Sequence, residues 1–170
     1  VVILTQPEGE TKLLGQALTL SVVASGSEPL VYQWHKGGEA IEGAKAKELV
    51  FEALATTDAA AYTVSISNEA GTVESESAGI TVHVPITITQ QPEEARVIEG
   101  ETTSFEVKAE GTEPIEYLWR FNSEVIDGAT GAVLTVENAS KANEGSYQVV
   151  MKNPAGSAVS EEVKLTVVQP

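Results

Sequence analysis

The second half of the chain repeats the first half at a constant offset, and the two halves align without insertion or deletion. Trp34 recurs as Trp119, for example, which sets the offset at 85 residues (119 minus 34). A period of this length is too long for a solenoid repeat and fits a small domain that folds by itself. The 170 residues therefore predict two copies of one domain, at 1–85 and 86–170.

Apolar and polar residues alternate along several short segments of each copy. Leu18, Leu20 and Val22 would share one face of a β-strand, because successive side chains on a strand point to opposite faces. Turn-forming residues follow at short intervals, as in the Gly-Ser-Glu-Pro segment 26–29. Short strands separated by such turns predict an all-β fold of two tandem β-sandwiches with Greek key connections, each of about seven or eight strands.

The alanine-rich segment 48–61 could form a helix when it is considered alone. Its equivalent in the second copy, 133–146, contains Thr, Val, Asn and Gly, and favours a strand, a loop and a tight turn. Both copies must share one fold, so we predict strands rather than a helix in both segments.

The joint between the copies, at Pro85, contains no Gly/Ser tract and no run of charges. Ile86 follows directly and opens the next apolar segment. Because proline restricts the backbone, we expect the last strand of the first copy to lead almost directly into the second copy. This predicts an extended, semi-rigid pair of domains placed end to end. We also expect the chain to be a segment of a longer protein.

Each copy has a glycine before its second strand, a tryptophan on the next buried strand and a segment that is similar to D-x-G-x-Y. Segment 143–147, Asn-Glu-Gly-Ser-Tyr, keeps the Gly and the Tyr, and segment 58–62, Asp-Ala-Ala-Ala-Tyr, keeps the Asp and the Tyr. In these features the whole chain resembles tandem intermediate-set domains of the immunoglobulin superfamily. The resemblance implies a tyrosine corner in each copy, in which the hydroxyl bonds to the backbone a few residues upstream.

Domains of this family commonly carry a disulfide between the two sheets, but the chain has no cysteine. The resemblance assigns the disulfide positions to Val22 and Val64 in the first copy, and to Val107 and Val149 in the second. A disulfide contributes about 2–4 kcal/mol, and a fully buried valine contributes about 1.5–3 kcal/mol, so packed valines replace it. The core residues that we predict are Val22, Trp34, Leu49, Tyr62, Val64, Val107, Trp119, Leu134, Tyr147 and Val149.

Segments 26–51 and 111–136 also resemble the cysteine-free immunoglobulin-like repeats of large bacterial surface proteins. Such repeats commonly read G-x-x-P-L-x-Y-Q-W followed by I-x-G-A. Domains of giant muscle proteins share the Trp and the Tyr, but carry this pair of motifs less often. The resemblance therefore implies an extracellular or cell-surface protein, and favours a bacterial one.

The formal net charge is −15, from 25 acidic and 10 basic residues, and the two copies share it almost evenly. A negative surface repels phosphate backbones and anionic lipids, so we expect no nucleic-acid partner. No segment has the roughly 18 consecutive apolar residues of a membrane-spanning helix, and we expect no direct membrane insertion.

The sequence shows no pattern of catalytic residues, and we predict that the chain is not an enzyme and binds no cofactor. Both histidines, His35 and His83, lie in the first copy, so a site built on them would exist in one domain only. We expect His35 to face solvent, because it follows the core tryptophan. There is no G-x-S-x-G motif and no glycine-rich phosphate loop.

Two further kinds of site receive little support. Glu93 and Glu94, just after the joint, are weak candidate ligands for calcium, but calcium loops favour compact Asp and Asn side chains and most acids here are Glu. A solvated acidic surface is the favoured interpretation. Tyr32, Tyr117 and Phe121 could suggest a carbohydrate platform, but they alternate with the core tryptophans and therefore point inward.

The exact repeat, the short joint and the missing chemistry favour a structural or adhesive module that acts as a stalk, surface-layer or filament element. Its expected partners are proteins or further copies of itself, which could add at open strand edges. One alternative is an intracellular cytoskeletal scaffold. The other is an accessory, carbohydrate-binding module of a secreted enzyme.

Overall fold

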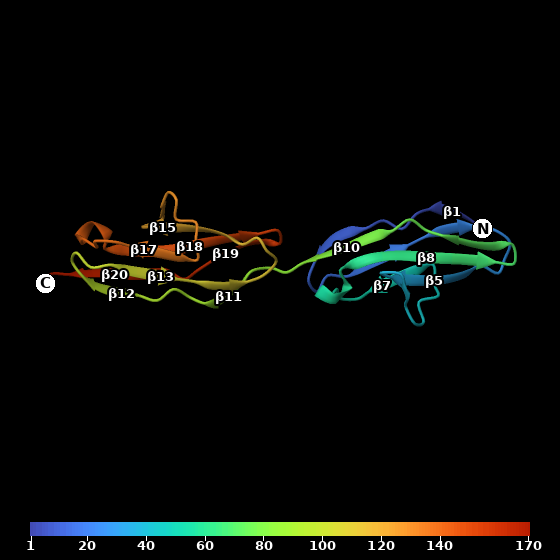
Figure 1. Cartoon of the computed structure of the whole chain (residues 1–170), viewed down its shortest axis with the longest axis horizontal. Helices are drawn as coiled ribbons and strands as arrows, with labels where there is room; N and C mark the ends of the chain where they lie inside the picture. The colour runs from blue at the N-terminus through green and yellow to red at the C-terminus, as the bar shows by residue number, and fades with distance from the viewer. The chain divides into compact units, whose positions relative to one another are not determined.

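The structure is a computed structural model that describes residues 1–170, and the chain divides into two compact units (Figure 1). Unit 1 comprises Val1–His83 and unit 2 comprises Val84–Pro170. His83 ends the last strand of unit 1, whereas the N–H of Val84 already donates to Thr112 Oγ1 within unit 2, at 2.7 Å. The division thus falls two residues before the boundary that the repeat offset predicts.

Each unit contains ten strands, one turn of 3-10 helix and no α-helix, which confirms the predicted all-β fold. Unit 1 consists of β1 (Val2–Thr5), β2 (Glu10–Leu13), β3 (Leu18–Ser21), β4 (Val23–Ser25), β5 (Val31–Lys36), β6 (Glu39–Ala40), β7 (Glu48–Phe51), η1 (Thr56–Asp58), β8 (Ala60–Asn68), β9 (Gly71–Glu74) and β10 (Ala78–His83). Unit 2 consists of β11 (Thr87–Gln90), β12 (Ala95–Ile98), β13 (Thr103–Glu106), β14 (Lys108–Glu110), β15 (Glu116–Phe121), β16 (Glu124–Val125), β17 (Val133–Val136), η2 (Lys141–Asn143), β18 (Gly145–Asn153), β19 (Gly156–Val159) and β20 (Val163–Val168).

Two sheets enclose the core of each unit. The larger sheet of unit 1 has the order β2-β10-β8-β5-β6, with β9 also paired to β8, and β2 runs parallel to β10. The smaller sheet comprises two strand pairs, β1 with β4 and β7 with β3, and only Val22 separates β3 from β4 along the chain. Unit 2 repeats this arrangement, with β12-β20-β18-β15-β16 in the larger sheet, so the prediction of two tandem sandwiches is confirmed.

The alanine-rich segment of unit 1 folds as the strand β7, the single turn η1 and the start of β8. The equivalent segment of unit 2 folds as β17, η2 and the start of β18. The strand prediction for both segments is therefore confirmed. Ala60 and Ala61 pair with β10 at the start of β8, and this tertiary pairing overrides the helix propensity of alanine.

Each unit has its own apolar core, centred on a tryptophan that is fully buried. Trp34 Nε1 donates to the carbonyl of Ala46 at 2.9 Å, and Trp119 Nε1 donates to the carbonyl of Gly131 at 2.8 Å. Nine of the ten positions that the sequence places in the core are at most 9% exposed. Leu49 is the tenth, and it lies half-buried against the core of unit 1.

A buried serine stands at the same place in both units, between the last two strand segments. Ser160 is 4% exposed, and its Oγ accepts from the N–H of Val149 at 3.0 Å and donates to the carbonyl of the next residue at 2.9 Å. Ser75 forms the same two bonds in unit 1, with the N–H of Val64 as donor at 2.9 Å. The hydroxyl thus satisfies backbone groups at a step in the sheet where strand pairing leaves them free.

Candidate interaction surface

The tyrosine corner expected from the resemblance is present in both units. Tyr62 donates its hydroxyl proton to the carbonyl of Asp58 at 2.9 Å, and Tyr147 donates to the carbonyl of Asn143 at 2.8 Å. Burial raises the pKa of both phenols above the ordinary value of 10.0, and the charge of Asp58 adds to the rise at Tyr62. Both hydroxyls are neutral and already bonded at pH 7, so they anchor the corner.

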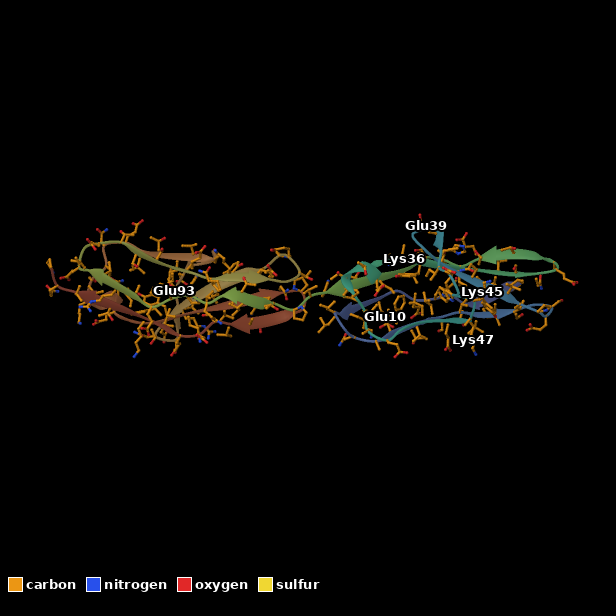
Figure 2. The ribbon with its side chains drawn as sticks, turned by 90° about the horizontal axis from the view of Figure 1, so that it is seen from below. Glu10, Lys36, Glu39, Lys45, Lys47 and Glu93 are labelled. Atoms are coloured by element: carbon orange, nitrogen blue, oxygen red, sulfur yellow. The ribbon has the colours of Figure 1, made fainter.

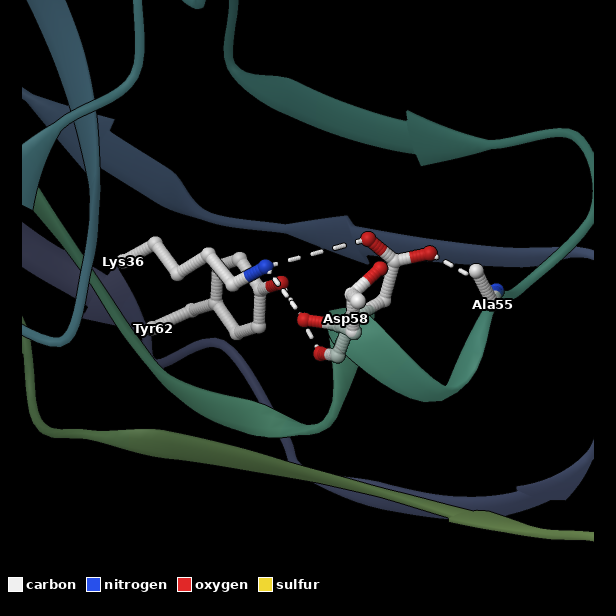
Figure 3. A network of polar contacts seen from close by, with 5 residues as sticks. Lys36, Ala55, Asp58 and Tyr62 are labelled. Carbon is white, nitrogen blue, oxygen red and sulfur yellow. Dashed lines mark hydrogen bonds and ion pairs between the residues drawn. The ribbon is translucent and has the colours of Figure 1, made fainter.

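The replacement of Asp58 by Asn143 in the second corner keeps the hydrogen bond from the backbone to the side chain, and the Ser140 hydroxyl donates a second bond to Asn143 Oδ1 at 3.0 Å. Asp58 Oδ2 accepts from the N–H of Ala55 at 2.8 Å, and Asn143 Oδ1 accepts from the N–H of Ser140 at 2.9 Å. The turn needs one acceptor oxygen at this position, and either side chain supplies it. In unit 1 the Nζ of Lys36 also lies 3.9 Å from Asp58 Oδ1, and Figure 3 shows the lysine reaching over the corner.

The glycine that the first corner lacks is required only in unit 2. A Cβ atom on Gly145 would lie 2.7 Å from the ring of Phe121 and 2.5 Å from the side-chain oxygen of Asn122. In unit 1 the equivalent residues are Lys36 and Gly37, which leave room for the Cβ of Ala60. The motif therefore differs between the copies because its neighbours differ.

The residues with acid–base or metal-binding chemistry do not gather into a site. Glu93 and Glu94 border one shallow depression together with Glu106, but no three His, Asp or Glu side chains converge closely enough to hold a metal ion. His83 lies half-buried at the end of β10. His35 is also half-buried, with Nδ1 covered and without a hydrogen-bond partner, so the expectation that it faces solvent is wrong.

None of the nine aromatic side chains is exposed. Tyr32, Tyr117 and Phe121 are half-buried and pack against the cores, as their alternation with the tryptophans predicts. These three rings therefore form no exposed platform. The structure also contains no helix that is long and apolar enough to cross a membrane.

The outward side of the larger sheet in unit 2 differs from the rest of this acidic chain. Four of the six basic residues of unit 2 lie there, each on a different strand: Arg96 on β12, Lys164 on β20, Lys152 on β18 and Arg120 on β15. Glu116, opposite Lys152 in the strand register, is the acidic residue among the outward positions of these strands. A net positive surface of this kind attracts acidic partners.

Apolar side chains occupy the middle of the same surface. Leu118 lies opposite Val150, and Val150 lies opposite Val159, so the three form one row across β15, β18 and β19. Val159 is 50% exposed. A depression of about 390 Å³ opens beside this row, between Leu118, Val150, Thr130 and Lys152. We call this surface the basic face; it consists of Arg96, Glu116, Leu118, Arg120, Val150, Lys152, Val159 and Lys164.

Unit 1 has no such surface, although its backbone is the same. Gln33, Ser65 and Glu74 stand where unit 2 has the apolar row. Three of the four lysines of unit 1 are labelled in Figure 2, and they come from β5 (Lys36) and from the loop before β7 (Lys45 and Lys47). The basic face is thus a property of the second copy alone, and sequence analysis missed it because it sought the features that the copies share.

The Immunoglobulin I-set domain family model matches residues 1–83 and 86–167. The chain is 29% identical to Endoglucanase C of the bacterium Cellulomonas fimi over 99% of its own length, and 32% identical to mouse Hemicentin-2 over 93%. It spans only 16% and 3% of these two relatives. Among solved structures, the I-band fragment I67-I69 of titin superimposes with a TM-score of 0.73 at 26% identity, over 99% of this chain and 66% of the fragment.

Proposed function

Because the chain belongs to the immunoglobulin I-set family, we propose that its two domains form a non-catalytic structural and adhesive module of a longer extracellular or cell-surface protein. The module holds its neighbours apart and takes part in protein–protein contacts. The relatives in this family that match the chain are much longer than it is, which supports a role as one part of a larger array.

The basic face is the observation that carries this proposal. Protein interfaces combine a central apolar patch with a polar rim, and the row Leu118, Val150 and Val159 between Arg120 and Lys152 has that composition. No enclosed cleft accompanies it, and no group of three or more His, Asp or Glu side chains is placed to hold a metal ion. The surface therefore supports docking of a protein and offers nothing to a chemical reaction.

Surface labelling of the source cells tests the proposed location. Antibodies against the two-domain chain should bind intact cells, and mild external protease should remove the signal. An antibody against a cytosolic enzyme serves as the control for cell integrity. Labelling that requires permeabilised cells would overturn the proposal in favour of an intracellular scaffold, the role to which the likeness to the titin I-band fragment points.

A second candidate function is that of an accessory module beside a catalytic domain, and the match to Endoglucanase C over 99% of the chain is the observation that favours it. Affinity electrophoresis in gels that contain carboxymethyl cellulose or xylan tests this function directly. Since no aromatic ring is exposed, we expect the chain to migrate like serum albumin in both gels. Retardation by either polymer would favour the accessory role.

A further inference from the structure

Unit 1 carries an exposed apolar surface of its own, on its smaller sheet. Val2, Leu4, Val23 and Val50, on the smaller sheet, are 60%, 64%, 50% and 53% exposed. Thr5 pairs with Val23, and Thr19 pairs with Val50, so these residues lie on strands that are joined in one sheet. We call this surface the apolar face; it consists of Val2, Leu4, Val23, Glu48 and Val50.

The apolar face is as specific to unit 1 as the basic face is to unit 2. The equivalent positions in unit 2 hold Thr87, Thr89, Lys108 and Thr135 in place of the four apolar residues. Each unit therefore lacks the surface that the other unit presents. The same strand topology with different outward residues supports separate roles for the two surfaces.

We propose that the apolar face of one chain docks on the basic face of a second chain, so that copies associate head to tail. The inference deepens the proposed adhesive function and rests on it. Because the two surfaces differ, the contact is heterologous: a pair of bound chains still offers one free apolar face and one free basic face, so further chains can add to it.

Charge complementarity favours a self-contact that includes the basic face. Two chains of net charge −15 repel each other, so a self-contact must avoid pairing acidic surfaces. The basic face brings Arg120 and Lys152 beside its apolar row, and the apolar face brings Glu48, the charged residue among its outward strand positions. Apolar side chains then meet apolar side chains, and Glu48 meets the basic residues Arg120 and Lys152.

The size of the apolar face limits the strength of the contact. Three strands about 4.8 Å apart give a surface about 15 Å wide, and eight residues of the long central strand give about 25 Å of length. The footprint of about 400 Å² is roughly half of what each partner buries in an interface of standard size. We therefore expect weak association in solution, and stronger association where many modules are tethered side by side.

Sedimentation velocity on the intact two-domain chain, from about 10 μM to about 1 mM, tests the proposal. The wild-type chain should form species whose mass keeps rising with concentration. The basic-face variant is Leu118→Gln/Val150→Ser/Val159→Glu, and the apolar-face variant is Val2→Thr/Leu4→Thr/Val23→Lys. Each substitution introduces the residue that the other unit already holds at the equivalent position, so both variants should fold.

Each variant alone should remain a monomer over the whole range, because one of its two faces is lost. An equal mixture of the two variants should form dimers and nothing larger, since each variant supplies the face that the other lacks. Val133→Glu, at a 51% exposed position outside both faces, is the matched control and should assemble like the wild type. Fluorescence of the buried Trp34 and Trp119 verifies that each unit is folded.

A wild-type chain that stays monomeric at about 1 mM would overturn the proposal, and so would a mixture that forms no dimers. An apolar-face variant that still dimerises by itself would show a symmetric contact between two basic faces and would also overturn it. None of these outcomes affects the cell-labelling test, so failure of head-to-tail docking and failure of the proposed function are distinguishable.

Discussion

Replacement of Ser160 by alanine should remove two hydrogen bonds at the step between β19 and β20. The N–H of Val149, a residue that is 0% exposed, would lose its 3.0 Å acceptor, and the carbonyl of Glu161 would lose its donor. A buried donor without a partner costs about 1–3 kcal/mol, and one ordinary hydrogen bond contributes about 0.5–1.5 kcal/mol. We therefore expect unit 2 to lose about 2–3 kcal/mol of unfolding free energy.

Urea denaturation followed by tryptophan fluorescence measures this loss. Each unit contains one tryptophan, so a Trp34→Phe background leaves Trp119 as the sole reporter of unit 2. With an m-value of about 1 kcal/mol/M for a small domain, the midpoint should fall by about 2–3 M. Ser157→Ala, at an exposed position on β19, is the matched control and should shift it by less than about 0.5 M. A Ser160→Ala midpoint equal to that of this control would refute the assignment of the hydroxyl to the buried N–H.

Three further predictions follow from differences between the copies and from the buried phenols. Ser123 has φ +72° in the hairpin loop where unit 1 has glycine, a backbone conformation that glycine adopts without strain. The substitution Ser123→Gly should therefore raise the stability of unit 2 by about 1 kcal/mol in the same urea assay. Gly145→Ala should lower the stability of unit 2 by about 1–3 kcal/mol, because the new Cβ meets the ring of Phe121 at 2.7 Å. The pKa values of Tyr62 and Tyr147 are raised by folding, so their contribution is fully present below the ordinary pKa of 10.0 and is lost as the pH rises through the folded values. Thermal unfolding should therefore show a decline in stability above about pH 10 that is smaller in a Tyr→Phe variant at either position, whereas equal slopes would contradict the prediction.

The shared interior of the two copies was predictable because burial is encoded by patterns that the sequence states twice. Trp34 and Tyr62, and their equivalents 85 residues later, have the same partners in both units. Period-two alternation specifies which side of a strand is buried, and it placed Tyr32 and Tyr117 correctly against the cores. Where only one copy was ambiguous, as in the alanine-rich segment, the other copy decided the fold.

The serine at the sheet step was not predictable from the pattern. Ser75 and Ser160 read as polar residues in a turn-like stretch, and nothing local shows that the chain shifts register there and turns the hydroxyl toward a buried N–H. The prediction that His35 faces solvent was wrong for a related reason. Alternation correctly takes it out of the core side, but it does not report how much of an outward ring is covered, and Nδ1 of His35 is covered.

The outward surfaces carry the information that distinguishes the copies. Selection for stability acts on both interiors in the same way, so corresponding core positions keep similar residues. Outward positions on a sheet contribute little to stability, and a passive spacer would therefore be expected to hold polar residues there in both units. Instead, the apolar row Leu118, Val150 and Val159 corresponds in the sequence alignment to Gln33, Ser65 and Glu74. The apolar residues of unit 1 correspond to threonines and a lysine in unit 2. Val2, Leu4, Val23 and Val50 are four of the six exposed large apolar residues of unit 1, and their clustering on one face supports the docking proposed there.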